Sequence, residues 1–136
     1  MKLIILLSFF ISVYSYATED HIIDLDMKKC LSLEANQTTS GMNDCVLKAT
    51  EAWNLELDKI YNKLMDELSV DGNKKLELSQ RQWIAYRDTE FTFLKEMYNR
   101  KEFSGSMYSN MNNMDALNVV KNRTLVLTRY AKRHKI

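Results

Sequence analysis

The sequence contains no proline and only three glycines, Gly41, Gly72 and Gly105, among its 136 residues. Proline and glycine interrupt helices most strongly, so their scarcity permits long helical segments. The segments between the glycines are rich in Leu, Lys, Glu and Met, which favour helix. No segment shows the alternation of apolar and polar residues that is typical of strands. The sequence therefore predicts an all-α protein, a small bundle of three long helices.

No apolar run is long enough to span a membrane, which requires about 20 residues. The run over residues 3–13 is broken only by two serines, follows Lys2, and precedes Ser15-Tyr16-Ala17, with small residues where a signal peptidase needs them. This pattern predicts a cleavable signal peptide at residues 1–17 and a single domain at residues 18–136. We expect a periplasmic or secreted protein without a membrane span after cleavage; an uncleaved anchor is the alternative.

Only two cysteines are present, Cys30 and Cys45. Their spacing is not CxxC, and the two histidines, His21 and His134, lie near opposite ends of the chain, which disfavours a redox or metal site. In an exported chain an isolated pair of cysteines typically forms a disulfide. We expect Cys30–Cys45 to join a short helix at about residues 26–34 to the first turn of the first long helix.

Neither sign of charge is in excess, since the chain has 19 basic and 18 acidic residues. Removal of Lys2 with the signal peptide makes the balance neutral, which disfavours nucleic acid as a partner. The charges nevertheless cluster at the ends of the mature chain, and we expect both clusters to be solvated termini. The clustered residues are Glu19, Asp20, Asp24 and Asp26 at the start and Arg129, Lys132, Arg133, His134 and Lys135 at the end.

Apolar residues at steps of three and four indicate the three long helices. The first should begin near Thr39 or Ser40, either of which can cap it, and end near Ser69, with residues 70–73 as a turn. The second should carry an apolar stripe and end before Ser104. The third should run from about residue 107 or 113 to residue 133. The apolar residues expected on these last two helices are Leu76, Trp83, Tyr86, Phe91, Leu94 and Tyr98, then Leu117, Val120, Thr124, Leu127 and Ala131.

Catalytic signatures are missing: the sequence has no Gly-rich phosphate loop, no HExxH, no GxSxG and no nucleophilic cysteine beside a histidine. Acidic pairs such as Asp66-Glu67 are typical of charged helix surfaces. A glycosidase-like pair stays open, because the separation it needs is spatial. The sequence therefore predicts a protein that is not an enzyme and that uses no cofactor and no metal.

The densest cluster of functional side chains is the segment over residues 80–88. Trp83 and Arg87 lie one helical turn apart, so the guanidinium can cover the indole face, and Gln80 lies a turn earlier on the same side. Such residues can anchor an interface. The alternative, which we favour, is a structural role in which Arg87 is bound to a carboxylate or to backbone carbonyls.

Three methionines, Met107, Met111 and Met114, have a spacing that places them on one face of a helix. Thioethers outside the cytoplasm can bind Cu(I). Flexible methionines more often fill irregular cores. Copper binding is therefore kept as an alternative function.

The sequence resembles the LprI-like N-terminal domain family, small exported proteins named after a lysozyme-inhibitor lipoprotein of mycobacteria. The resemblance covers about residues 30–130, and its most specific part is the segment Q-R-x-W-I-x-Y-R-D. The residues that carry it are Cys30, Thr39, Met42, Cys45, Leu57, Tyr61, Leu64, Gln80, Arg81, Trp83, Ile84, Tyr86, Arg87, Asp88, Gly105, Ser106, Arg123 and Leu127.

Two departures from the family pattern concern a second cysteine pair that members usually carry. Phe91 stands at the first of those positions, and the second falls near Asp115. Val120 also stands where a threonine is usual. The resemblance therefore implies a last helix that is less firmly held than in a typical member.

The resemblance implies a protein partner, with lysozyme as the named candidate, and supplies no catalytic residues. The rival prediction is an interaction module of the envelope without lysozyme activity. Loops displayed by rigid helices can enter an enzyme cleft. The candidate partner-binding loop joins the last two helices and contains a basic pair, two aromatic residues and a glycine, the alternative being an ordinary helix connection. Its candidate contact residues are Arg100, Lys101, Phe103, Gly105, Ser106 and Tyr108.

Overall fold

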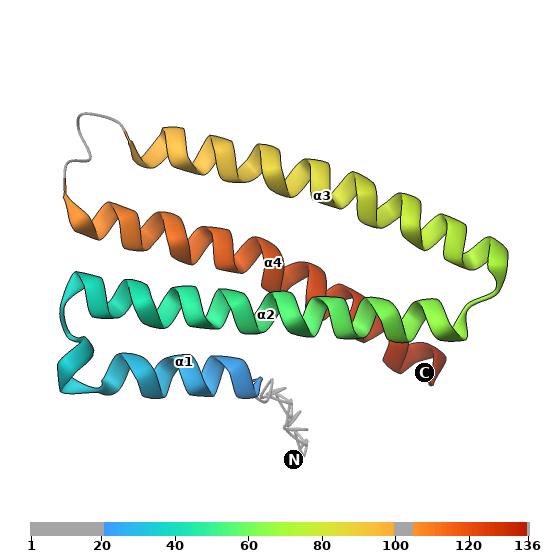
Figure 1. Cartoon of the computed structure of the whole chain (residues 1–136), viewed down its shortest axis with the longest axis horizontal. Helices are drawn as coiled ribbons and strands as arrows, with labels where there is room; N and C mark the ends of the chain where they lie inside the picture. Colours follow the sequence, from blue (N-terminus) through green and yellow to red (C-terminus); the bar gives the residue numbers. More distant parts are fainter. Residues whose placement is uncertain (1–20, 100–104, 136) are drawn as a thin grey trace, which may run out of the picture.

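The computed structural model describes residues 21–99 and 105–135, which form four α-helices and one short 3-10 helix (Figure 1). No strand occurs in these ranges, so the all-α prediction is confirmed. None of the described helices combines the length and apolar character needed to cross a membrane. The predicted signal peptide lies outside the described residues. The elements are α1 (Ile22–Ser32), η1 (Glu34–Asn36), α2 (Thr39–Glu67), α3 (Val70–Tyr98) and α4 (Ser106–His134).

The core lies between α2 and α4, which run in the same direction, while α3 runs opposite to both (Figure 1). Apolar residues at helical spacing on each helix meet along the whole contact. Thr124 is fully buried because its hydroxyl donates to the carbonyls of Val120, at 3.0 Å, and Trp53, at 3.4 Å. All five residues expected on the inner face of the last helix are buried. The core residues are Val46, Ala49, Trp53, Leu57, Ile60, Leu64, Leu117, Val120, Leu127 and Ala131.

The predicted disulfide is confirmed: Cys30 of α1 is bonded to Cys45 of α2, with 5.7 Å between the Cα atoms. Cys45 lies in the second turn of α2 rather than the first. The linker between the helices packs tightly, since a Cβ at Gly41 would lie 2.6 Å from the Cα of Asn36. Asn36 Nδ2 also donates to the Cys30 carbonyl at 2.9 Å. The disulfide and Asn36 together hold α1 against α2.

The predicted start of α2 near Thr39 is confirmed, but the capping residue is wrong by one position. The cap is Thr38, whose hydroxyl accepts from the Gly41 amide at 3.1 Å, rather than Thr39 or Ser40. Residues 70–73, expected to form a turn, are the first turn of α3. Ser69 caps this turn by accepting from the Gly72 amide at 3.2 Å. A serine cap satisfies an amide of the first turn, which outweighs the breaking tendency of one glycine there.

Helix α3 packs along α4 and has little contact with the other helices (Figure 1). Leu94 is its one buried residue in the described range, whereas α4 buries five. Helix α4 lies between α2 and α3, and the expectation that it is less firmly held than in a typical family member stays a prediction. Tyr86, expected on the inner stripe of α3, is instead half exposed.

Candidate interaction surface

The helical spacing of the segment over residues 80–88 brings three of its side chains toward α4. Gln80, Trp83 and Arg87 follow one another at steps of three and four, so they share one face of α3. All three are partly buried. Arg123 of α4 meets this face: its Nε donates to Gln80 Oε1 at 3.0 Å, and its Nη2 donates to Ser79 Oγ at 3.2 Å. These bonds connect the two helices.

Two guanidinium groups flank the indole ring of Trp83. The Cζ atom of Arg87 lies 5.4 Å from the ring centroid, as the sequence predicts, and that of Arg123 lies 5.9 Å away. Arg87 also donates from Nε and Nη2 to Asp88 Oδ1, at 2.9 and 2.7 Å. Burial lowers the pKa of Arg123 from its ordinary value, an effect that Tyr130 partly opposes. Arginine still remains protonated at neutral pH. The aromatic cluster, which consists of Trp83, Arg87 and Arg123, therefore contains two positively charged side chains.

Four other side chains of the same segment are exposed: Arg81, Ile84, Tyr86 and Asp88. Asp88 nevertheless accepts from Arg87, and Tyr86 lines a groove with Trp83. The segment thus presents one face to α4 and another to solvent, a division that helical spacing imposes. A groove of about 250 Å³ lies between this segment of α3 and α4. Its lining residues are Trp83, Tyr86, Val119, Asn122, Arg123 and Val126.

An ion pair at the start of α1 was not expected from the sequence. Asp24 is buried, and its Oδ2 lies 2.8 Å from Lys121 Nζ of α4. The prediction that the acidic start of the mature chain is solvated is therefore wrong for Asp24, although Asp26 is exposed. The signal that could have revealed it is helical spacing, since Asp24 lies one turn before Met27, which packs on the core.

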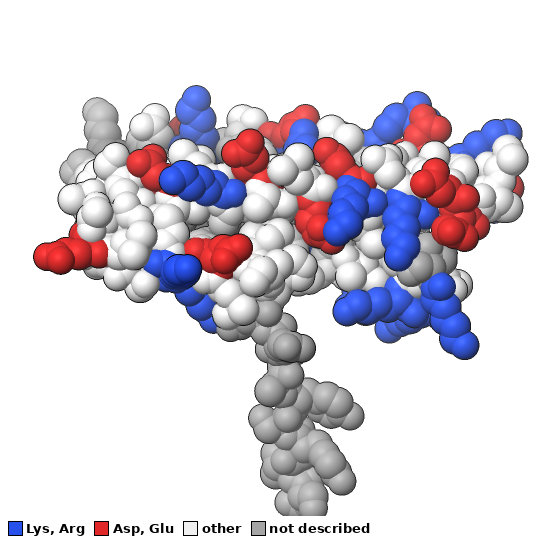
Figure 2. Space-filling model, turned by 60° about the horizontal axis from the view of Figure 1, so that its bottom comes forward, with Lys and Arg blue, Asp and Glu red and all other residues white. Residues whose placement is uncertain are grey.

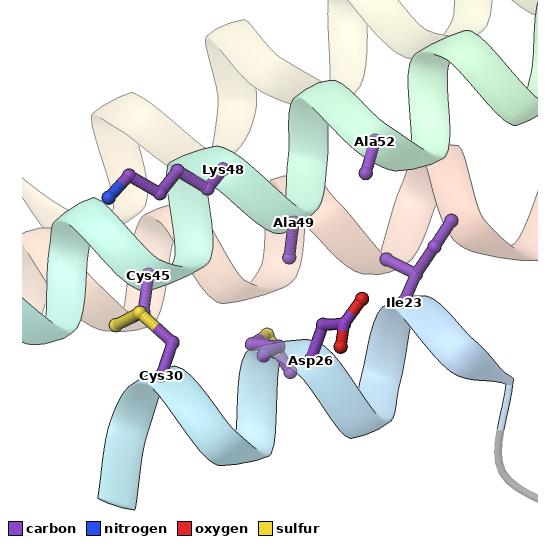
Figure 3. A pocket seen from close by; sticks show the side chains of 8 residues that line it. Ile23, Asp26, Cys30, Cys45, Lys48, Ala49 and Ala52 are labelled. Carbon is purple, nitrogen blue, oxygen red and sulfur yellow. A yellow bond between two sulfur atoms is a disulfide. The ribbon is translucent and has the colours of Figure 1, made fainter. Parts of the chain in front are cut away.

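A cavity of about 270 Å³ lies between α1 and α2 beside the disulfide (Figure 3). Its walls are mostly apolar, and the carboxylate of Asp26 points toward α2 at one side. The sequence offered no signal for it, because the cavity forms where two short side chains, Ala49 and Ala52, face α1. The lining residues are Ile23, Asp26, Met27, Cys30, Cys45, Lys48, Ala49 and Ala52.

The sequence matches the family described as "Lysozyme inhibitor LprI" over residues 26–127, which is more than half of the chain. The chain belongs to the LprI family. The matched range includes the disulfide, the aromatic cluster and Arg123.

A crystal structure of an uncharacterised protein from Burkholderia thailandensis is similar to this LprI-family chain, with a TM-score of 0.78 and 28% sequence identity. The alignment covers 85% of this chain and 56% of that one, so this chain spans little more than half the length of that protein. The search of curated proteins gives no match.

In this LprI-family protein the predicted partner-binding loop is only partly described, since Arg100, Lys101 and Phe103 lie outside the described residues. Gly105 has a φ of 145°, a conformation that favours glycine. The helices on both sides of the loop are fastened by polar contacts. Tyr98 Oη donates to Asp115 Oδ2 at 2.6 Å, and Ser106 Oγ donates to Thr39 Oγ1 at 3.2 Å.

The start of α4 is also tied to α2. Asn43 Oδ1 accepts from Asn110 Nδ2 at 3.1 Å and from Asn113 Nδ2 at 3.3 Å. These bonds fix the first turns of α4 on α2. Two positions of the candidate loop, Ser106 and Tyr108, therefore belong to the first turn of a fixed helix.

Basic side chains gather where α4 ends, and Figure 2 shows them at one end of the molecule. Leu125 and Thr128 line a shallow depression there with Arg129, Lys132 and Arg133. This basic end of α4 is a second surface that a partner with acidic groups could contact.

The three methionines of α4 differ in exposure. Met107 and Met111 are exposed, whereas Met114 packs against the core. Among the described residues no group of three or more His, Cys, Asp and Glu side chains is arranged to hold a metal ion. Copper binding through thioethers stays a prediction.

Proposed function

We propose that this LprI-family protein is a non-enzymatic inhibitor of lysozyme that works outside the cytoplasm. The observation that carries the proposal is the family match over residues 26–127. The Cys30–Cys45 disulfide supports an oxidising compartment. The signal pattern at residues 1–17 supports export by cleavage after Ala17.

The segment over residues 100–108 is the contact that we propose for lysozyme. Lysozymes cleave glycosidic bonds with two carboxyl groups, and Arg100 and Lys101 supply positive charge that can meet them. Phe103 supplies an apolar anchor. The segment joins two helices whose facing ends are fastened by the Tyr98–Asp115 and Ser106–Thr39 hydrogen bonds. Fixed ends reduce the entropy that binding must remove, which favours insertion into a cleft.

A cell-wall lysis assay with the mature protein at micromolar concentration tests the proposal. We expect the unmodified protein to slow lysozyme, and the double substitution Arg100→Ser and Lys101→Ser, or Phe103→Ser alone, to weaken inhibition at least tenfold. The matched control removes two charges from an exposed side of α2 through Lys59→Ser and Lys63→Ser. This control should inhibit normally. The melting curves of all variants should coincide.

The same preparation tests export. The intact mass of protein recovered from the periplasm should correspond to residues 18–136 minus two hydrogens for the disulfide. Retention of residues 1–17, or two thiols that alkylate freely in the folded protein, would contradict this part of the proposal.

A second candidate function is an envelope interaction module without lysozyme activity. The groove beside Trp83, Tyr86 and Arg123 favours it, because aromatic and arginine side chains around a hollow are typical of binding anchors. If the unmodified protein slows no lysozyme, this candidate replaces the first. Tyr86→Ser should then abolish capture of the periplasmic partner while leaving the melting temperature unchanged.

A further inference from the structure

Helix α3 has a second apolar stripe outside its packed contact with α4, and Tyr86 at the edge of this stripe also lines the groove between the two helices. Leu78, Tyr86 and Phe93 are each about half exposed and lie along one side of the helix. Between them lie the uncharged residues Gln82, Ala85, Thr89 and Thr92. In Figure 1, α3 is the outermost helix on its side of the bundle, and no described helix covers this stripe.

The stripe is symmetric about the point between Ala85 and Tyr86. Leu78 and Phe93 lie equally far from this point along the helix, and so do Lys75 and Glu96. Leu78 therefore corresponds to an apolar residue, Phe93, and Lys75 corresponds to a residue of opposite charge, Glu96.

Such symmetry specifies how the helix can pair with itself. In an antiparallel pair centred on this point, Leu78 of each copy faces Phe93 of the other, and Lys75 of each copy faces Glu96 of the other. A parallel pair in register would instead place Lys75 against Lys75 and Glu96 against Glu96, which repels. An antiparallel pair of this kind has two-fold symmetry, which is the commonest symmetry of homodimers.

We propose that the outer stripe of α3 is a homodimer interface, in which two copies of this chain pair antiparallel about Ala85 and Tyr86. A second copy is the partner that fits the stripe, because Lys75 and Glu96 meet as opposite charges when two copies of α3 lie antiparallel. The intrahelical ion pairs of Lys75 with Asp71 and Arg81 with Glu77 do not oppose this, since exposed pairs contribute little and can exchange partners. The interface involves one helix from each copy, so we expect a dissociation constant on the order of 1–100 μM. The inference is independent of lysozyme inhibition.

Charge reversal tests the pairing by sedimentation velocity at low salt. With Lys75→Glu, the new glutamate of each copy faces Glu96 of the other, so both contacts become repulsive. With Glu96→Lys, the new lysine of each copy faces Lys75 of the other, with the same effect. Each variant alone should dimerise about tenfold more weakly than the unmodified protein. An equimolar mixture of the two variants should dimerise as well as the unmodified protein, because both contacts become attractive in the mixed pair.

Apolar substitutions give a second, independent readout. Leu78→Asp should leave the protein monomeric up to about 500 μM with an unchanged melting temperature, since the side chain is half exposed. The matched control Leu55→Asp, at an exposed leucine of α2, should dimerise normally. The proposal is overturned if the unmodified protein is monomeric at 500 μM, if Leu55→Asp abolishes the dimer as Leu78→Asp does, or if the mixed charge variants fail to recover association.

Discussion

Lys121 of α4 binds the carboxylate of Asp24 of α1, with 2.8 Å between Nζ and Oδ2. The side chain of Asp24 is 10% exposed and that of Lys121 is 27% exposed, so water screens the pair only in part. Lys121 Nζ also lies 5.6 Å from the centroid of Trp53, the largest fully buried side chain. The pair therefore links the start of α1 to α4, whereas the disulfide links the other end of α1 to α2.

Removal of this carboxylate should destabilise the protein. Asp24→Ala leaves a partly buried ammonium without its partner, and we expect a loss of about 1–3 kcal/mol in the free energy of unfolding. Urea denaturation followed by circular dichroism measures it. Asp26→Ala, at an exposed aspartate of the same helix that has no ion pair with the described residues of α4, should change stability by less than about 0.5 kcal/mol. Equal effects of the two substitutions would show that the ion pair contributes nothing specific.

The two tryptophans should differ in their contribution to stability. Trp53 is fully buried in the α2–α4 core, and Trp53→Ala should cost about 3–5 kcal/mol. Trp83 is only partly buried between α3 and α4, so Trp83→Ala should cost clearly less, about 1–3 kcal/mol. Thermal melting of both variants decides the order. If Trp83→Ala leaves the melting temperature unchanged but abolishes partner binding, the aromatic cluster is an interface rather than a structural contact.

Loss of the disulfide should weaken the protein without changing its fold. The bridge closes a short loop, with a sequence separation of 15, so replacement of Cys30 and Cys45 by serine should cost about 3 kcal/mol. The helical circular dichroism should persist, because the α2–α4 core does not include α1. A variant that loses most of its helical signal at room temperature would show that α1 is required for the bundle to fold.

The hydrogen bond between Tyr98 and Asp115 should make stability depend on pH in the alkaline range. This bond, with burial and the negative charge of Asp115, raises the pKa of Tyr98 above its ordinary value of 10.0. The folded state therefore holds the phenol proton more tightly than the unfolded state. The stabilisation is complete below about pH 10 and is lost as the pH rises through the raised pKa.

Tyr98→Phe should remove this dependence. At neutral pH we expect the variant to be about 1 kcal/mol less stable than the unmodified protein, a difference that should shrink between about pH 10 and 12. Urea denaturation at a series of pH values measures the difference. The control is Tyr86→Phe, at a half-exposed tyrosine of the same helix. A constant difference between Tyr98→Phe and the unmodified protein at all pH values would contradict the assignment.

The sequence by itself was sufficient to predict the helices, the disulfide and the core face of α4. These features depend on local spacing: Leu117, Val120 and Thr124 repeat at helical intervals, and Cys30 has only Cys45 as a partner. The contact of Arg87 with the ring of Trp83 was also predictable, because both residues belong to one helical turn.

Only the tertiary structure decided how the helices are arranged around one another. A helix that is apolar on two sides does not reveal which side will be covered, and the order of the bundle places α4, not α3, in the middle. Arg123 meets Gln80, and Lys121 meets Asp24, across long stretches of sequence. Such contacts depend on the relative rotation and offset of whole helices, which is set by the fit of many side chains at once and is not encoded in any local pattern.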